Sequence, residues 1–206
     1  EVMRMLGDMR YVTPGEYQAF VTDKSEEMRK RFLQTLPPEH REEVEKKTPL
    51  GWVEMRLAFQ PDGEYAKWLH SLDTVVKING IVFLHGGISP AVADKSCEMI
   101  NDTVRRDLST DIEKTASDPL HSLVAREDGP LWYRDLMLQP DTFESSVDEI
   151  LSKQHASSIV VAHTVTPNGR IVSRWNGKVV GIDTGMQPAY VQAGRASALE
   201  IQGDKL

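Results

Sequence analysis

Two histidines stand where buried strands are predicted to end. The apolar run Ile81-Val82-Phe83-Leu84 leads directly into His85, and Ser158-Ile159-Val160-Val161-Ala162 leads into His163. Short runs of this kind are typical of strands that are buried on both faces. A neutral imidazole is the commonest metal ligand, and a rigid strand end presents it with little entropy left to lose. A single histidine of this kind is more often a hydrogen-bonded loop or core residue, but two of them in one small domain favour a metal site.

Arg134 is the third side chain with chemistry to offer. It follows the loop signal Glu127-Asp128-Gly129-Pro130 and stands beside Trp132 and Tyr133. A planar guanidinium aims a fork of donors at an oxyanion and suits this task better than a lysine ammonium would. The same pattern also fits an arginine whose stem packs on the rim of the protein. Both interpretations of Arg134 stay open at the level of sequence.

The residues after His85 favour a ligand site at this edge of the sheet. Gly86 and Gly87 follow the histidine and leave room for something close to the backbone. In layered α/β folds, the loops at the carboxyl ends of the strands are free to carry polar groups while the strands hold them rigid. We therefore expect both histidines at one edge of one sheet, close enough to share a cation.

The elements that position these residues follow from periodicity and from turn signals. A polar-faced helical region precedes the first strand, and the chain from Ser158 onward is strand and turn. Asn79-Gly80 and Asn176-Gly177 are hairpin turn signals. Helices are expected within 2–11 and over 13–20, 25–36, 39–47, 51–59, 63–72, 91–108, 110–116 and 141–154, and strands over 75–78, 81–84, 159–162, 170–175, 178–182 and 195–201.

Composition narrows the class of protein. A chain of 206 residues can bury a sizeable core and fits one domain, with or without an insertion. Its net charge of −7 produces a field that repels nucleic acid and anionic membranes. No apolar run reaches the roughly 18 residues of a membrane span. The single cysteine, Cys97, excludes an internal disulfide framework and a cysteine-based zinc cluster.

Five motifs in order resemble the calcineurin-like metallophosphoesterases, and most closely the Shewanella-like protein phosphatases. They are Phe83-Leu84-His85-Gly86-Gly87-Ile88-Ser89, Gly129-Pro130-Leu131-Trp132-Tyr133-Arg134, Val161-Ala162-His163-Thr164, Gly181-Ile182-Asp183-Thr184-Gly185 and Ala196-Ser197-Ala198-Leu199-Glu200. The resemblance implies an α/β fold, the metallophosphoesterase αβ-sandwich of two mixed β-sheets flanked by helices. Residues 1–206 would form the C-terminal portion of this single domain, with a helical insertion over about 13–72.

The start of the chain carries a further resemblance. Glu1-Val2-Met3 is similar to the end of the family's Gly-Asn-His-Glu motif, with Glu1 as its final glutamate. We therefore expect a fragment that lacks its N-terminal part, and localisation stays open between cytoplasm and periplasm. The family's aspartate motifs, its asparagine ligand and its general-acid histidine would all precede Glu1. On this basis no catalytic acid is expected within the chain.

The resemblance also implies roles for particular residues. His85 and His163 would bind one of two divalent metal ions, which could be manganese, iron or zinc. Arg134 would contact the phosphate of the substrate. Supporting roles would fall to Glu1, Gly86 and Thr164.

The reaction implied is attack on phosphorus by a hydroxide that bridges the two metal ions. The expected partner is a phosphorylated protein or a small phosphoester, without nucleic acid. Two alternatives remain open: a dinucleoside-polyphosphate hydrolase of the same superfamily and a non-catalytic scaffold on this fold. Because two histidines alone bind a metal weakly, we expect the 206-residue chain by itself to be inactive.

Overall fold

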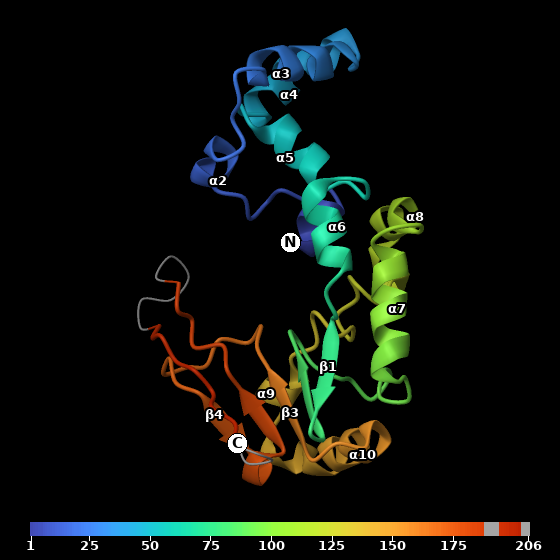
Figure 1. Ribbon diagram of the computed structural model, residues 1–206, viewed down its shortest axis with the longest axis vertical. Helices are drawn as coiled ribbons and strands as arrows, with labels where there is room; N and C mark the ends of the chain where they lie inside the picture. The colour runs from blue at the N-terminus through green and yellow to red at the C-terminus, as the bar shows by residue number, and fades with distance from the viewer. Residues whose placement is uncertain (188–193, 203–206) are drawn as a thin grey trace. The chain divides into compact units, whose positions relative to one another are not determined.

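The computed structural model describes residues 1–187 and 194–202, which fall into two compact units (Figure 1). The first unit is Glu1–Leu72 and the second is Asp73–Leu206. Whether residues 13–72 are an insertion into one larger domain stays a prediction. Within the described residues, no helix combines the length and the apolar character that crossing a membrane requires.

The first unit is helical, as its periodicity predicts. Thr13 caps α2: its hydroxyl accepts from the Glu16 backbone, and the Glu16 carboxylate accepts from the Thr13 backbone. The core of the unit includes Met55 and Phe59, and the exposed Tyr65 stacks its ring on Phe59. Its helices are α1 (Val2–Met5), α2 (Pro14–Gln18), α3 (Ser25–Gln34), α4 (Pro38–Lys47), α5 (Trp52–Ala58) and α6 (Glu64–His70).

The second unit is built on one mixed sheet of five strands. Their order is β1-β2-β3-β5-β4, in which β2, β3 and β5 run parallel while the outer strands β1 and β4 pair antiparallel (Figure 1). All residues of β3 and β5 are buried, as expected for central parallel strands. The strands are β1 (Val75–Ile78), β2 (Ile81–Leu84), β3 (Ser158–Val161), β4 (Val172–Arg174) and β5 (Val179–Gly181).

The helix α7 (Cys97–Asp107) begins where a side chain caps it. The helix expected over 91–108 is wrong at its start, because the Ser96 hydroxyl accepts from the Met99 backbone and fixes the first turn there. The short α9 was not predicted. The elements are α7 (Cys97–Asp107), α8 (Ile112–Ser117), α9 (Asp135–Leu138) and α10 (Glu144–Gln154), with 3-10 turns at Pro119–His121, Asp141–Phe143 and Trp175–Gly177.

Asn101 joins α7 to the sheet by closing part of the outer edge of β1. Its Oδ1 accepts from the backbone amides of Thr74 and Val75 at 2.8 and 2.9 Å. Its Nδ2 donates to the Val75 carbonyl at 2.9 Å. The buried amide therefore takes the place of a neighbouring strand at this point and blocks further pairing.

The strand expected over 195–201 is wrong. In this segment Leu199 and Ile201 pack against the buried cluster of Ile81, Val160 and Val180, so the alternation of apolar residues is real. Within the described residues, however, no strand lies beside 195–201 to pair with its backbone, and only a single bridge forms at Gln202. The α/β class is confirmed, whereas the described residues form one sheet and not the two of a sandwich.

The three hydrogen bonds of Asn101 generate a stability prediction. Asn101→Ala should lower the free energy of unfolding by about 3 kcal/mol, because it leaves buried backbone groups of β1 without partners. Urea denaturation measures the change, and Asp102→Ala on the exposed face of the same helix is the control. A loss for Asn101→Ala no larger than that of the control would contradict this role.

Candidate functional site

His85 and His163 meet at the carboxyl edge of the sheet. Strands β2 and β3 are parallel neighbours, with Leu84 opposite Val161. The backbone of Ala162 extends this pairing by donating to the His85 carbonyl at 2.9 Å. His85 Nε2 then lies 2.9 Å from His163 Nδ1, with 4.7 Å between the ring centroids. The placement predicted from the two strand ends is therefore observed.

The backbone at His163 adopts a conformation that is uncommon for a side-chain-bearing residue. Its φ is +59°, in the left-handed region. The Thr164 amide donates to the Ala162 carbonyl, so His163 is the apex of a tight turn directly after β3. Strained residues of this kind persist where the surrounding structure holds them, and they cluster at functional sites. The contribution of Thr164 seen here comes from its backbone.

Gly86 and Gly87 make room for another part of the chain. Their amides donate to the Pro130 carbonyl at 2.9 and 3.2 Å. A Cβ atom on Gly86 would lie 2.8 Å from both the Pro130 oxygen and the Leu131 carbonyl carbon. The backbone approach predicted from these glycines is therefore made by the loop that carries Trp132 and Arg134.

This loop delivers an aromatic ring and a positive charge to the histidines. Trp132 meets the His163 ring edge-on, with 5.4 Å between centroids, and its Nε1 donates to the Val124 carbonyl at 3.0 Å. Arg134 is exposed, and its charge acts to lower the pKa of both His85 and His163. The arginine thus lies near the pair, and its contact with a phosphate stays a prediction.

Both histidines are neutral near pH 7. Burial is the main cause that lowers the pKa of His163 to about 4, and the charges of His85 and Arg134 lower it further. Burial also lowers the pKa of His85. The negative charge of Asp183 opposes the shift at both rings. Neutral rings leave a nitrogen lone pair available for a cation.

Asp183 is a residue of this edge that the sequence interpretation did not select. It follows β5, the parallel neighbour of β3, by two residues. Its carbonyl accepts from Thr166 at 2.8 Å, and its carboxylate accepts from the Gly185 amide at 3.0 Å. The sequence carries a signal for Asp183, because a third buried strand pattern also leads into this polar residue. Glu1 lies in the first unit, where it pairs with Arg4.

The pair of histidines fits part of a metal shell. Two nitrogens that each bind one ion at roughly 2.0 to 2.1 Å lie no more than about 4.2 Å apart, and the observed separation falls inside this limit. His163 Nε2 is buried without a hydrogen-bond partner among the described residues. Over residues 1–187 and 194–202, no three His, Cys, Asp or Glu side chains are arranged to hold an ion. The histidines therefore suit two positions of a shell that needs further ligands.

The fold of the chain is similar to that of solved phosphatases. Two solved structures of the cold-active protein tyrosine phosphatase, one of them described as from a psychrophilic Shewanella species, superpose with TM-scores of 0.60 and 0.61 at 23% and 25% identity. Each match covers 90% of this chain and 46% or 47% of the solved chain. No protein-family model matches the chain.

The sequence comparisons name the particular relatives. Shewanella-like protein phosphatase 1 of Plasmodium berghei is 34% identical over 130 residues, which is 61% of this chain and 36% of the relative. An uncharacterized protein of Schizosaccharomyces pombe is 29% identical over 98% of this chain and 52% of its own length. The resemblance to Shewanella-like protein phosphatases is confirmed. The chain spans about half or less of the length of these relatives.

The low pKa of His163 predicts how stability changes with pH. Because the folded-state pKa of about 4 lies below the ordinary 6.5, protonation favours the unfolded chain. The free energy of unfolding should not depend on this group above about pH 6.5 and should fall as the pH drops from 6.5 toward 4. His163→Gln should remove this part of the pH dependence. Urea denaturation from pH 4 to 8 measures it.

The exposed His40→Gln is the matched control for that series. The control should keep the wild-type slope between pH 4 and 6.5. Equal slopes for wild type and His163→Gln would contradict the assignment of the low pKa to His163.

Proposed function

We propose that this chain forms part of the catalytic domain of a metal-dependent phosphoesterase that hydrolyses phosphomonoesters of proteins. The observation that carries the proposal is the meeting of His85 Nε2 and His163 Nδ1 at 2.9 Å, at the carboxyl edge of the sheet in a relative of protein phosphatases. A chance pair of core histidines would have no reason to sit at the ends of neighbouring parallel strands beside an exposed arginine.

The residues of the chain have separate tasks in this proposal. His85 and His163 hold one metal ion through neutral rings, which the strand ends and Trp132 keep in place. Divalent ions, when bound, polarise the phosphoryl oxygens and lower the pKa of water. Arg134 donates to the phosphoryl oxygens as negative charge develops on them. The remaining ligands and the acid for the leaving group come from the segment that carries the family's aspartate and histidine motifs.

Exposed apolar side chains support the two-sheet arrangement of the proposed fold. Val76 and Ile78 of β1 are 36% and 56% exposed. They lie opposite Phe83 and Ile81, which belong to an apolar cluster on the same face of the sheet. Such a face is stabilised when another layer covers it. We propose that a second sheet packs here in the whole protein.

Phosphoproteins are the substrate class that the relatives favour. The Plasmodium relative is named a protein phosphatase, and the solved Shewanella enzyme is titled a protein tyrosine phosphatase. The exposed position of Arg134 is open to a phosphoryl group on a large molecule. The choice among phosphoserine, phosphothreonine and phosphotyrosine depends on surfaces beyond the histidines.

The central activity test compares the 206-residue chain with a longer form that includes the upstream motifs. With manganese and p-nitrophenyl phosphate, the longer form should turn over, and the 206-residue chain should not, because it holds only two ligands. His85→Ala or His163→Ala should abolish turnover of the longer form, while His40→Ala should leave it intact. Metal-dependent turnover by the 206-residue chain, or activity that survives the loss of either strand-end histidine, would contradict the proposal.

Arg134 has a kinetic prediction of its own. In the longer form, Arg134→Ala should lower kcat/KM on the order of 10²-fold, the scale for one preorganised donor to the transition state. Arg134→Lys should recover only part of the loss, because an ammonium cannot match the planar fork. Unchanged kinetics in both variants would make Arg134 a packing residue.

A further inference from the structure

A cavity of about 490 Å³ lies beside Arg134 in the second unit and carries mostly negative charge. We call it the acidic pocket. It is lined by three carboxylates, two aromatic rings and one arginine: Glu127, Asp128, Asp135, Trp132, Tyr133 and Arg134. The negative charge of this cavity would weaken the binding of a phosphate to Arg134, and the positive charge of Arg134 would weaken the binding of a cation in the cavity. The combination is therefore uncommon.

Tyr133, which lines the acidic pocket, has a hydroxyl group without a hydrogen-bond partner among the described residues. The residue is only 7% exposed, and its hydroxyl is buried without a hydrogen bond to any described residue. Burial, followed by the negative charges of Asp135 and Asp128, raises the pKa of this phenol. Buried polar groups are nearly always satisfied in folded proteins, so an orphan of this kind points to a ligand.

The free carboxylates set the chemistry of that ligand. Asp128 is paired with Arg126 at 2.6 Å. Glu127 and Asp135 have no cationic side chain as a partner in the part of the chain that the structure describes. The same residues offer no three-carboxylate arrangement that could hold a metal ion. An organic cation fits better, because it can donate hydrogen bonds to carboxylates and to a phenol oxygen and can pack on the Trp132 ring.

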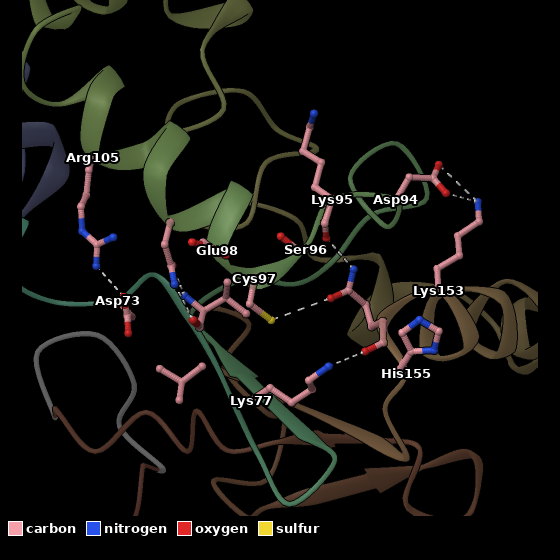
Figure 2. Close-up of a pocket in the computed structure, with 14 residues that line it drawn as sticks. Asp73, Lys77, Asp94, Lys95, Ser96, Cys97, Glu98, Arg105, Lys153 and His155 are labelled. Carbon is pink, nitrogen blue, oxygen red and sulfur yellow. Dashed lines mark hydrogen bonds and ion pairs between the residues drawn. The ribbon is translucent and has the colours of Figure 1, made fainter.

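The larger cavity of the second unit differs in this respect. It measures about 730 Å³ and lies beside β1 and the start of α7 (Figure 2). Figure 2 shows three of its four lysine and arginine side chains engaged: Arg105 with Asp73, Lys153 with Asp94, and Lys77 with the carbonyl of Gln154. Every one of these contacts is internal to the protein. Among the described residues, no buried polar side-chain atom of this larger cavity lacks a hydrogen-bond partner, so the cavity gives no comparable indication of a missing ligand.

We propose that the acidic pocket binds the basic side chain, arginine or lysine, of a residue near the phosphorylated residue of the substrate. The inference rests on the proposed phosphatase function, because Arg134 then holds the phosphate while the acidic pocket holds the neighbouring cation. The two charges of such a segment match the two charges of this surface. Trp132 both lines the acidic pocket and meets the His163 ring at 5.4 Å between centroids, so the distance between the two sites is within one peptide segment.

The test measures peptide binding to the 206-residue chain by fluorescence anisotropy. The probes are labelled phosphotyrosine peptides with one arginine placed in turn at each of the three positions on either side, an all-alanine version, and unphosphorylated counterparts. At one or more positions, arginine should tighten binding roughly tenfold over alanine, the scale of a charge-assisted hydrogen bond. Lysine at the same position should give part of the gain.

Two variants connect the preference to the acidic pocket. Tyr133→Phe keeps the ring and loses no hydrogen bond, so its melting temperature should not fall, yet it should weaken the arginine preference. Asp135→Asn should do the same at nearly constant volume. Glu98→Gln, which removes one charge at the larger cavity, should keep the preference and controls for net charge. All four proteins should bind the alanine phosphopeptide equally.

The outcomes separate this inference from the proposed function. Phosphate-dependent binding that is indifferent to arginine at every position would overturn the inference and leave the phosphatase proposal standing. An arginine preference that survives both Tyr133→Phe and Asp135→Asn would also overturn it. Equal binding of phosphorylated and unphosphorylated arginine peptides, with the preference lost in both variants, would support the acidic pocket and count against the phosphatase proposal.

Discussion

The parallel pairing of β2 with β3 is the constraint on which the rest of the site depends. A shift of one residue would turn the side chains of either strand to the opposite face and separate the two imidazoles. The register is held because Leu84 lies opposite Val161 and because the ladder continues from Ala162 to the His85 carbonyl. Both strands are also buried, so a slip would expose apolar surface. The buried core thereby determines the distance between the two histidines.

Arg134 and Asp183 place charges of opposite sign near the histidine pair. Arg134 lowers and Asp183 raises the pKa of each ring, while burial keeps both rings neutral. The glycines after β2 let the loop with Trp132 approach the strand end, and the tryptophan then meets His163. A neutral donor pair beside an exposed guanidinium suits a cation together with an anionic substrate. The same loop contributes the acidic pocket, so the proposed phosphate contact and the proposed cation site share one segment.

The sequence predicts the local parts of this structure well. The bounds of β1 and β2 and the turn at Asn79-Gly80 agree with expectation, because strand pattern and turn chemistry are both local. The start of α7 was missed because the Ser96 cap overrides the apolar residues before it. Residues 195–201 alternate like a strand, yet strand formation needs a neighbour, which periodicity does not reveal. The contact of Trp132 with His163 and the approach of Tyr133 to Gly87 join distant segments and could not be predicted from spacing.

The central claim is that His85 and His163 present one nitrogen each to a shared cation. Long-range ¹H–¹⁵N NMR of the imidazole nitrogens during a zinc titration tests it most directly, because each ring nitrogen reports its own protonation and coordination. The account predicts that His85 Nε2 and His163 Nδ1 move together toward metal-bound shifts at millimolar zinc, since two ligands bind weakly. The account is contradicted if the other four histidines respond at the same zinc concentration, or if only one of the pair does.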